Sequence, residues 1–205
     1  MRTLTPVTYQ DGTGQSSAPR PIPTAYTAPA GAWQHPSNFL SSANNTLSSG
    51  SVYFSPLDVG PAPKAYDRLG VNVGTAQVGG STTFTLGLYP DDGSGGAPNT
   101  AAGPLVSGPV PLTAGGLAAL TISGTLQPAR YWMASLYVST TAPTTAPLVA
   151  VISNASPGLW IPPTLSIGSL SRALVLTSQT ALPTTASSPV GGSSSNIPVV
   201  AARAA

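Results

Sequence analysis

The residues of this chain best suited to chemistry are two adjacent carboxylates, Asp91 and Asp92, followed by Gly93. Carboxylate oxygens grouped in a tight loop can ligate calcium. The same residues also form hairpin turns, in which Asp accepts backbone hydrogen bonds and Gly adopts a positive φ angle. Residues 90–98, PDDGSGGAP, are almost all turn-forming types, so a turn is favoured and calcium binding stays open.

The rest of the composition argues against catalysis. The chain has no Glu, and Asp11, Asp58 and Asp67 are dispersed, whereas glycoside hydrolysis needs two opposed carboxyl groups. The only imidazole, His35, lies in a proline-rich stretch that gives a catalytic triad little rigid support. The absence of Cys excludes thiolate catalysis and thiolate metal sites. We expect a non-enzymatic protein with no catalytic residue, no metal site and no cofactor.

Aromatic side chains are the other candidate for a functional surface. In residues 131–138, YWMASLYV, Trp132 is in phase with the apolar positions and is expected in the core, while Tyr131 and Tyr137 point the other way. Tyr89 takes the outward phase of its own segment. An outward patch of these three tyrosines predicts a subunit interface, or else a surface that contacts glycans.

Strands have to position these side chains. In residues 82–89, TTFTLGLY, the apolar residues Phe84, Leu86 and Leu88 fall on one face, which is the period of a strand with one buried face. Turn residues recur every eight to twelve positions or so, the spacing of a sandwich. We predict an all-β fold, an antiparallel β-sandwich or jelly-roll-like domain. The predicted core is Leu69, Val71, Val73, Phe84, Leu86, Leu88, Leu120, Ile122, Trp132 and Leu136.

Composition divides the chain into three parts. Residues 1–50 are rich in Pro, which fixes φ and lacks a hydrogen-bond donor, so we expect an extended N-terminal arm. Residues 51–153 carry the strand pattern and form the predicted sandwich. Residues 154–205 are rich in Pro and Ser, and we expect them to dock on the domain or on neighbouring subunits.

The charge is sparse: seven Lys plus Arg face five Asp, a net charge of +2. The basic residues are scattered along the chain, whereas nucleic-acid binding needs them on one face, so we expect no nucleic-acid partner. No segment approaches the ~18 consecutive apolar residues of a membrane span, and residues 1–20 lack the apolar run of a signal peptide.

Residues 66–138 resemble a module found in structural proteins of tailed bacteriophages, in particular those that infect actinobacteria. The resemblance is carried by DRLGV at residues 67–71, LGLYPDDG at 86–93, LTIS at 120–123, Leu126, Pro128, and YWMA at 131–134. Ala129 stands where this module has Gly, a change that a turn tolerates.

This resemblance implies a virion component in contact with other virion proteins, and a homo-oligomer with a trimer favoured. We expect a minor tail, tail-tip or fibre protein, with host attachment as an open further role. Two alternatives remain. One is a head decoration or head-fibre protein on the capsid surface, and the other is a stand-alone module that binds cell-wall carbohydrate of the host.

Overall fold

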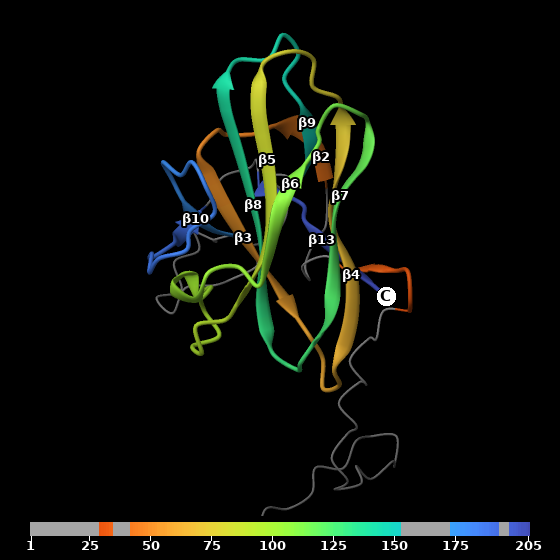
Figure 1. Ribbon diagram of the computed structural model, residues 1–205, viewed down its shortest axis with the longest axis vertical. Coiled ribbons are helices and arrows are strands. Elements are labelled where there is room, and N and C mark those ends of the chain that lie inside the picture. Colours follow the sequence, from red (N-terminus) through yellow and green to blue (C-terminus); the bar gives the residue numbers. More distant parts are fainter. Residues whose placement is uncertain (1–28, 35–41, 153–172, 193–196) are drawn as a thin grey trace, which may run out of the picture.

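The computed structural model describes residues 29–34, 42–152, 173–192 and 197–205, which form an antiparallel β-sandwich (Figure 1). The seven-stranded first sheet contains β1 (Trp33–Gln34), β2 (Ser42–Thr46), β4 (Lys64–Thr75), β7 (Gly116–Leu126), β9 (Leu148–Ile152), β12 (Ile197–Pro198) and β13 (Ala201–Ala204). The six-stranded second sheet has the order β11 (Val190–Gly192), β10 (Ala173–Leu176), β3 (Ser51–Asp58), β8 (Arg130–Thr141), β5 (Ser81–Pro90) and β6 (Val106–Val110). One 3-10 turn, η1 (Thr100–Ala102), follows the loop after β5. The all-β class and the antiparallel sandwich are confirmed, whereas jelly-roll connectivity stays a prediction.

The main core lies between the two sheets. Leu69 and Val71 of β4 and Leu86 and Leu88 of β5 are each no more than 2% exposed. Leu120 of β7 is only partly buried, at the margin of this core. The other residues that were expected in the core and lie between the sheets are Val73, Phe84 and Ile122. The alternation of apolar residues therefore correctly predicted which side chains of β4 and β5 face the core.

Strand β8 is buried on both faces, and this corrects its expected orientation. Tyr131, Met133 and Tyr137 point into the core between the sheets. Trp132 and Leu136 are buried as expected, but they belong to a second apolar cluster on the opposite face of β8. Both alternating sets of β8 are mostly apolar, so the period of two predicted the strand but not which set faces the other sheet.

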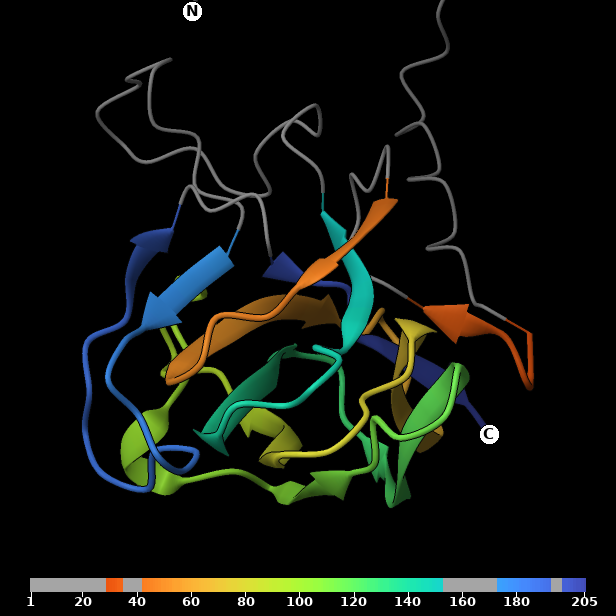
Figure 2. The ribbon, with the colours of Figure 1, turned by 90° about the horizontal axis from the view of Figure 1, so that it is seen from above.

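A second apolar cluster covers the outer face of the second sheet, and it explains why Tyr89 is not at the surface. Leu182 seals this face and lies over Gly87, where an added Cβ would be 2.6 Å from its Cδ1. Tyr89 is 0% exposed, packs edge-on against Phe54 with ring centroids 5.4 Å apart, and donates its hydroxyl to the Pro183 carbonyl at 2.8 Å. The segment that follows β10, blue in Figure 2, runs along this side of the sandwich.

The sandwich extends beyond residues 51–153 on both sides. β1 and β2 join the first sheet from the N-terminal part, and the described residues after 172 add strands to both sheets. β4 and β9 pair with each other only around Val73 and Val149. Beyond that point β12 pairs with β9, and β13 lies between β4 and β1. We call the space between β4, β9 and β1 that residues 197–205 fill the slot.

Tryptophan and glycine pack together on the outer face of the first sheet. A Cβ added at Gly70 of β4 would lie 2.8 Å from the Trp33 ring and 2.9 Å from Leu117. Glycine at position 70 therefore lets the Trp33 side chain of β1 reach across β13 to β4.

Within the described residues no helix is long and apolar enough to cross a membrane.

One buried hydroxyl in the core leads to a first prediction. Ser135 Oγ lies on the inner face of β8, is buried, and has no hydrogen-bond partner in the described part of the chain. A buried polar group without a partner is destabilising, so the Ser135→Ala variant is expected to raise the free energy of unfolding by about 1 kcal/mol. Urea unfolding measures this, with Ser123→Ala on the exposed face of β7 as control. A lower urea midpoint for Ser135→Ala would instead show that the Ser135 hydroxyl has a hydrogen-bond partner.

Candidate functional site

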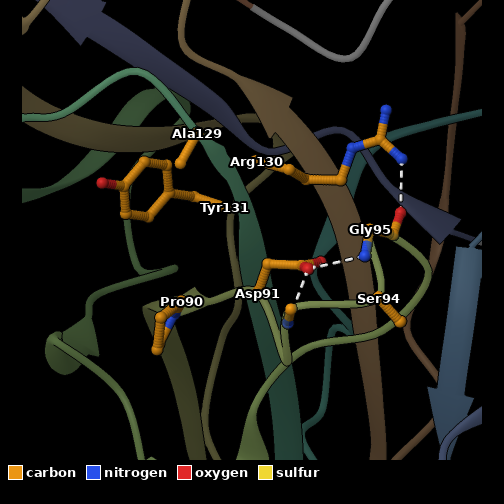
Figure 3. A pocket seen from close by; sticks show the side chains of 8 residues that line it. Pro90, Asp91, Ser94, Gly95, Ala129, Arg130 and Tyr131 are labelled. Atoms are coloured by element: carbon orange, nitrogen blue, oxygen red, sulfur yellow. Dashed lines mark hydrogen bonds between the residues drawn. The ribbon is translucent and has the colours of Figure 1, made fainter.

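Beside the loop after β5 lies an open hollow of about 540 Å³ whose lining includes a carboxylate, Asp91, and a guanidinium, Arg130 (Figure 3). The loop forms because β5 ends at Pro90 and the Gly-rich residues after it allow a tight return to η1. The start of β8 forms the opposite wall. The lining residues are Pro90, Asp91, Gly93, Ser94, Gly95, Ala129, Arg130 and Tyr131.

Asp91 is the centre of the loop. Its Oδ2 accepts hydrogen bonds from the backbone N–H groups of Gly93 at 2.9 Å and Gly95 at 2.7 Å. Its Oδ1 accepts a third, from Trp132 Nε1 at 2.9 Å. Gly93 and Gly95 have φ angles of 93° and 73°, a region that glycine adopts without strain. Asp91 therefore fastens the turn to β8.

This arrangement of donors does not suit a cation. Both oxygens of Asp91 face N–H groups, whose positive ends would repel a calcium ion at the same place. In Asp92, Oδ1 accepts from Ser94 N at 2.8 Å and from Ser94 Oγ at 2.5 Å. The hydrogen bond from the Ser94 side chain, aided by that from its backbone N–H, holds the pKa of Asp92 below its usual range. In the described ranges, no three His, Cys, Asp or Glu side chains gather as a metal site.

Arg130 ties the same loop to β3. Its Nη1 donates to the Gly95 carbonyl at 2.6 Å, as Figure 3 shows. Its Nε and Nη2 donate to the two oxygens of Asp58, at 2.7 and 3.1 Å. The side-chain hydrogen bond to Asp58 raises the pKa of Arg130. Asp58 therefore balances the charge of Arg130, while the Asp91 carboxylate in the same hollow is held by N–H donors alone.

The three tyrosines do not form the outward patch that the sequence predicted. Tyr89 and Tyr137 are buried on opposite faces of the second sheet. Tyr131 reaches the wall of the hollow but is only 9% exposed, and its hydroxyl donates to the Gln127 carbonyl at 3.3 Å. The prediction of a shared interface or glycan surface is therefore wrong. His35, the other sequence candidate, lies outside the described residues.

Sequence reasoning missed the partners of these charged groups. Asp91 and Trp132 are 41 positions apart, and Asp58 and Arg130 are 72 apart. No local pattern predicts contacts over such separations. The turn-forming composition around Asp91 did predict the loop itself, which the structure places between β5 and η1.

Replacing Asp91 tests the role of the loop. The Asp91→Ala change removes three accepted hydrogen bonds and leaves the Trp132 indole N–H without this partner. We expect the free energy of unfolding to fall by about 2–3 kcal/mol. Urea unfolding measures it, and Asp92→Ala, which loses bonds to Ser94 alone, is the matched control with a smaller loss. A rise in melting temperature on adding millimolar calcium to the wild type would contradict the turn assignment.

A second ion pair fastens β13 to β4. Arg203 Nε donates to Asp67 Oδ1 at 2.8 Å, and its Nη2 bonds the other carboxylate oxygen. The hydrogen bond from Arg203 holds the pKa of Asp67 below its usual range. A carboxyl group with a lowered folded-state pKa stabilises the fold above its unfolded pKa of about 3.9, and this is lost as pH falls through the folded pKa.

Acidification should therefore loosen β13. As pH falls below about 4, we expect hydrogen-exchange protection of the Ala202 and Ala204 amides to decrease before that of β5. The Asp67→Asn variant should lose this pH dependence in β13, while the contribution of Asp92 to the pH dependence of overall stability remains. Equal loss of protection in β13 and β5 would mean that the ion pair does not control this strand.

A scan against known protein families, a search of curated proteins and a search of solved structures all find no match for this chain. Its function therefore has to be inferred from the chemistry of the described residues.

Proposed function

We propose that this chain is a non-enzymatic structural protein of a tailed-phage virion, acting in the tail, the tail tip or a fibre. One observation carries the proposal. The acids that are best placed for chemistry are used to hold the sandwich together: Asp91 by Trp132 and the loop backbone, Asp58 by Arg130, and Asp67 by Arg203. Side chains engaged in this way contribute to the fold, which supports a structural role.

The residues that carry the phage resemblance serve the same purpose. The DRLGV segment lies in β4, where Asp67 anchors β13. The segments LGLYPDDG and YWMA lie in β5 with its loop and in β8, and Asp91 joins them through Trp132. The motif is thus explained by strand pairing and turn closure. This supports a structural module.

The alternatives stand differently. A carbohydrate-binding module that stacks sugars on Tyr89, Tyr131 and Tyr137 is not supported, since all three are buried. A head decoration or head-fibre protein differs from a tail protein only in its location on the particle. The same localisation experiment separates these two, so no second function is proposed.

Localisation on purified particles tests the proposal. Particles of a phage that encodes the chain are analysed by quantitative mass spectrometry and by electron microscopy with an antibody against the folded protein. We expect several copies per particle and label on the tail. Label on the head would overturn the tail assignment. Absence from particles, together with a monomeric protein that does not bind them, would overturn the virion role.

A further inference from the structure

Four neighbouring strands of the first sheet present a row of side chains on its outer face. Trp33 of β1 lies opposite Arg203 of β13. Arg203 in turn lies opposite Arg68 of β4, which lies opposite Thr121 of β7. Residues paired in this way point to the same side of a sheet. Ala202, next to Arg203, is buried in the core, so the row faces outward. We call these four paired residues the outer row.

The two guanidinium groups of the outer row are not fully balanced. Arg203 and Arg68 lie directly opposite each other, and like charges in this arrangement repel. Asp67 accepts hydrogen bonds from Arg203 on both carboxylate oxygens. Within the part of the chain that the structure describes, Arg68 forms no hydrogen bond or ion pair, and it is partly exposed. The carboxylate therefore offsets one of the two positive charges, and an anion bound at Arg68 would offset the other.

The Trp33 ring adds an apolar face to one end of the outer row. It packs over Gly70 and beside Leu117, and Trp33 remains partly exposed. The negative face of an aromatic ring attracts the C–H groups of a sugar ring. At the other end, Thr121 is exposed, and its hydroxyl can donate and accept hydrogen bonds. Ring, cation and hydroxyl together supply the stacking, charge pairing and hydrogen bonding that an acidic saccharide needs.

Strand pairing fixes the outer row before any ligand arrives. β1, β13, β4 and β7 are neighbours in one sheet. With strands about 4.8 Å apart, the row is about 14 Å long. This length suits several linked sugar units better than a single one. Groups that are already in place lose less conformational entropy when a ligand binds.

We propose that the outer row is a binding site for an acidic saccharide. A carboxylate or phosphate group of the saccharide pairs with Arg68, and a neighbouring sugar ring packs against Trp33. Arg68 sets the preference for acidic over neutral sugars, because a hydrogen bond between charged groups is stronger than a neutral one. The site goes beyond the proposed virion role, and its absence would leave the particle-localisation result unchanged.

A nuclear magnetic resonance titration of the full chain tests this site with defined sugars. The indole N–H signal of Trp33 is assigned with a Trp33→Phe variant. It is then followed on addition of a galacturonic acid trisaccharide, of its neutral methyl ester, and of a neutral trisaccharide with and without a phosphate group. We expect at least one acidic trisaccharide to shift this signal and to bind at least ten times more tightly than its neutral counterpart. Absence of a shift with both acidic sugars would overturn the proposal.

The decisive variant is Arg68→Gln, which should bind the acidic trisaccharide at least ten times more weakly while its unfolding midpoint stays near that of the wild type. Lys64→Gln is the matched control. It removes an equal charge from the same strand, but the Lys64 Nζ lies over the Tyr66 ring, outside the outer row, so the affinity should change less than twofold. Equal losses in both variants would overturn the proposal. Equally tight binding of an aspartate peptide would also overturn it and indicate a site for acidic protein segments.

Discussion

Removal of residues 197–205 is expected to abolish cooperative folding of the sandwich. The change takes away two fully buried aliphatic side chains, Ile197 and Val200, and opens the slot between β4 and β9. Each such side chain contributes about 1.5–3 kcal/mol, and each lost backbone hydrogen bond about 0.5–1.5 kcal/mol. The sum is comparable with the whole stability of a domain, about 5–15 kcal/mol. Circular dichroism and urea unfolding of the shortened chain measure the loss.

Two neighbouring point variants test whether the loss of stability comes from the buried strand rather than from the shorter chain. Ala202 is 0% exposed and faces the core, whereas Ala201 is partly exposed. The Ala202→Asp variant places a charge in the slot and should unfold the protein, since a buried unpaired charge is strongly destabilising. The Ala201→Asp variant should fold. A shortened chain with a wild-type unfolding midpoint would show that β12 and β13 are dispensable.

The Tyr89→Ala variant is expected to lower the free energy of unfolding by about 3–5 kcal/mol. It empties the centre of the outer cluster, where the Tyr89 ring packs edge-on against Phe54. The Tyr89→Phe variant keeps the ring but leaves the Pro183 carbonyl without its hydroxyl donor, and should lower stability by about 1–2 kcal/mol. Thermal and urea unfolding give both values.

The control for Tyr89 is Val190→Ala, because Val190 is 67% exposed on β11 and its truncation should change little. This series also tests the cover over the second sheet. If Tyr89→Ala left the unfolding midpoint unchanged, Leu182 and Pro183 would not cover this face in solution. The tyrosine would then be available at the surface for a partner, as the sequence alone suggested.

The strands and the turn could be predicted because their signals are local. Alternation in residues 82–89 gave both the strand and its inward side chains, since Thr83 and Thr85 alternate there with apolar residues. In β8 both alternating sets of side chains are mostly apolar, so alternation does not indicate which set faces the other sheet. The cover over Tyr89 comes from Leu182 and Pro183, more than ninety positions later, and no periodicity within β5 reports it.

The contacts of the candidate site were out of reach for the same reason. The composition around Asp91 predicted a turn, but its third hydrogen bond depends on where β8 places the Trp132 indole. The two ion pairs join residues 72 and 136 positions apart, and they exist only once both sheets have formed. Local rules therefore predicted the elements, and packing between distant strands decided what the charged groups do.

The position of β13 inside the first sheet also constrains how this protein folds. Asp67 and Arg203 are 136 positions apart, so the sheet closes only after a very long loop has been ordered. Chains dominated by such non-local pairing fold slowly, in roughly milliseconds to seconds. Until β13 arrives, the facing edges of β4 and β9 stay open to strands of other molecules. Folding intermediates should therefore aggregate at high protein concentration, and the refolding yield should fall as protein concentration rises.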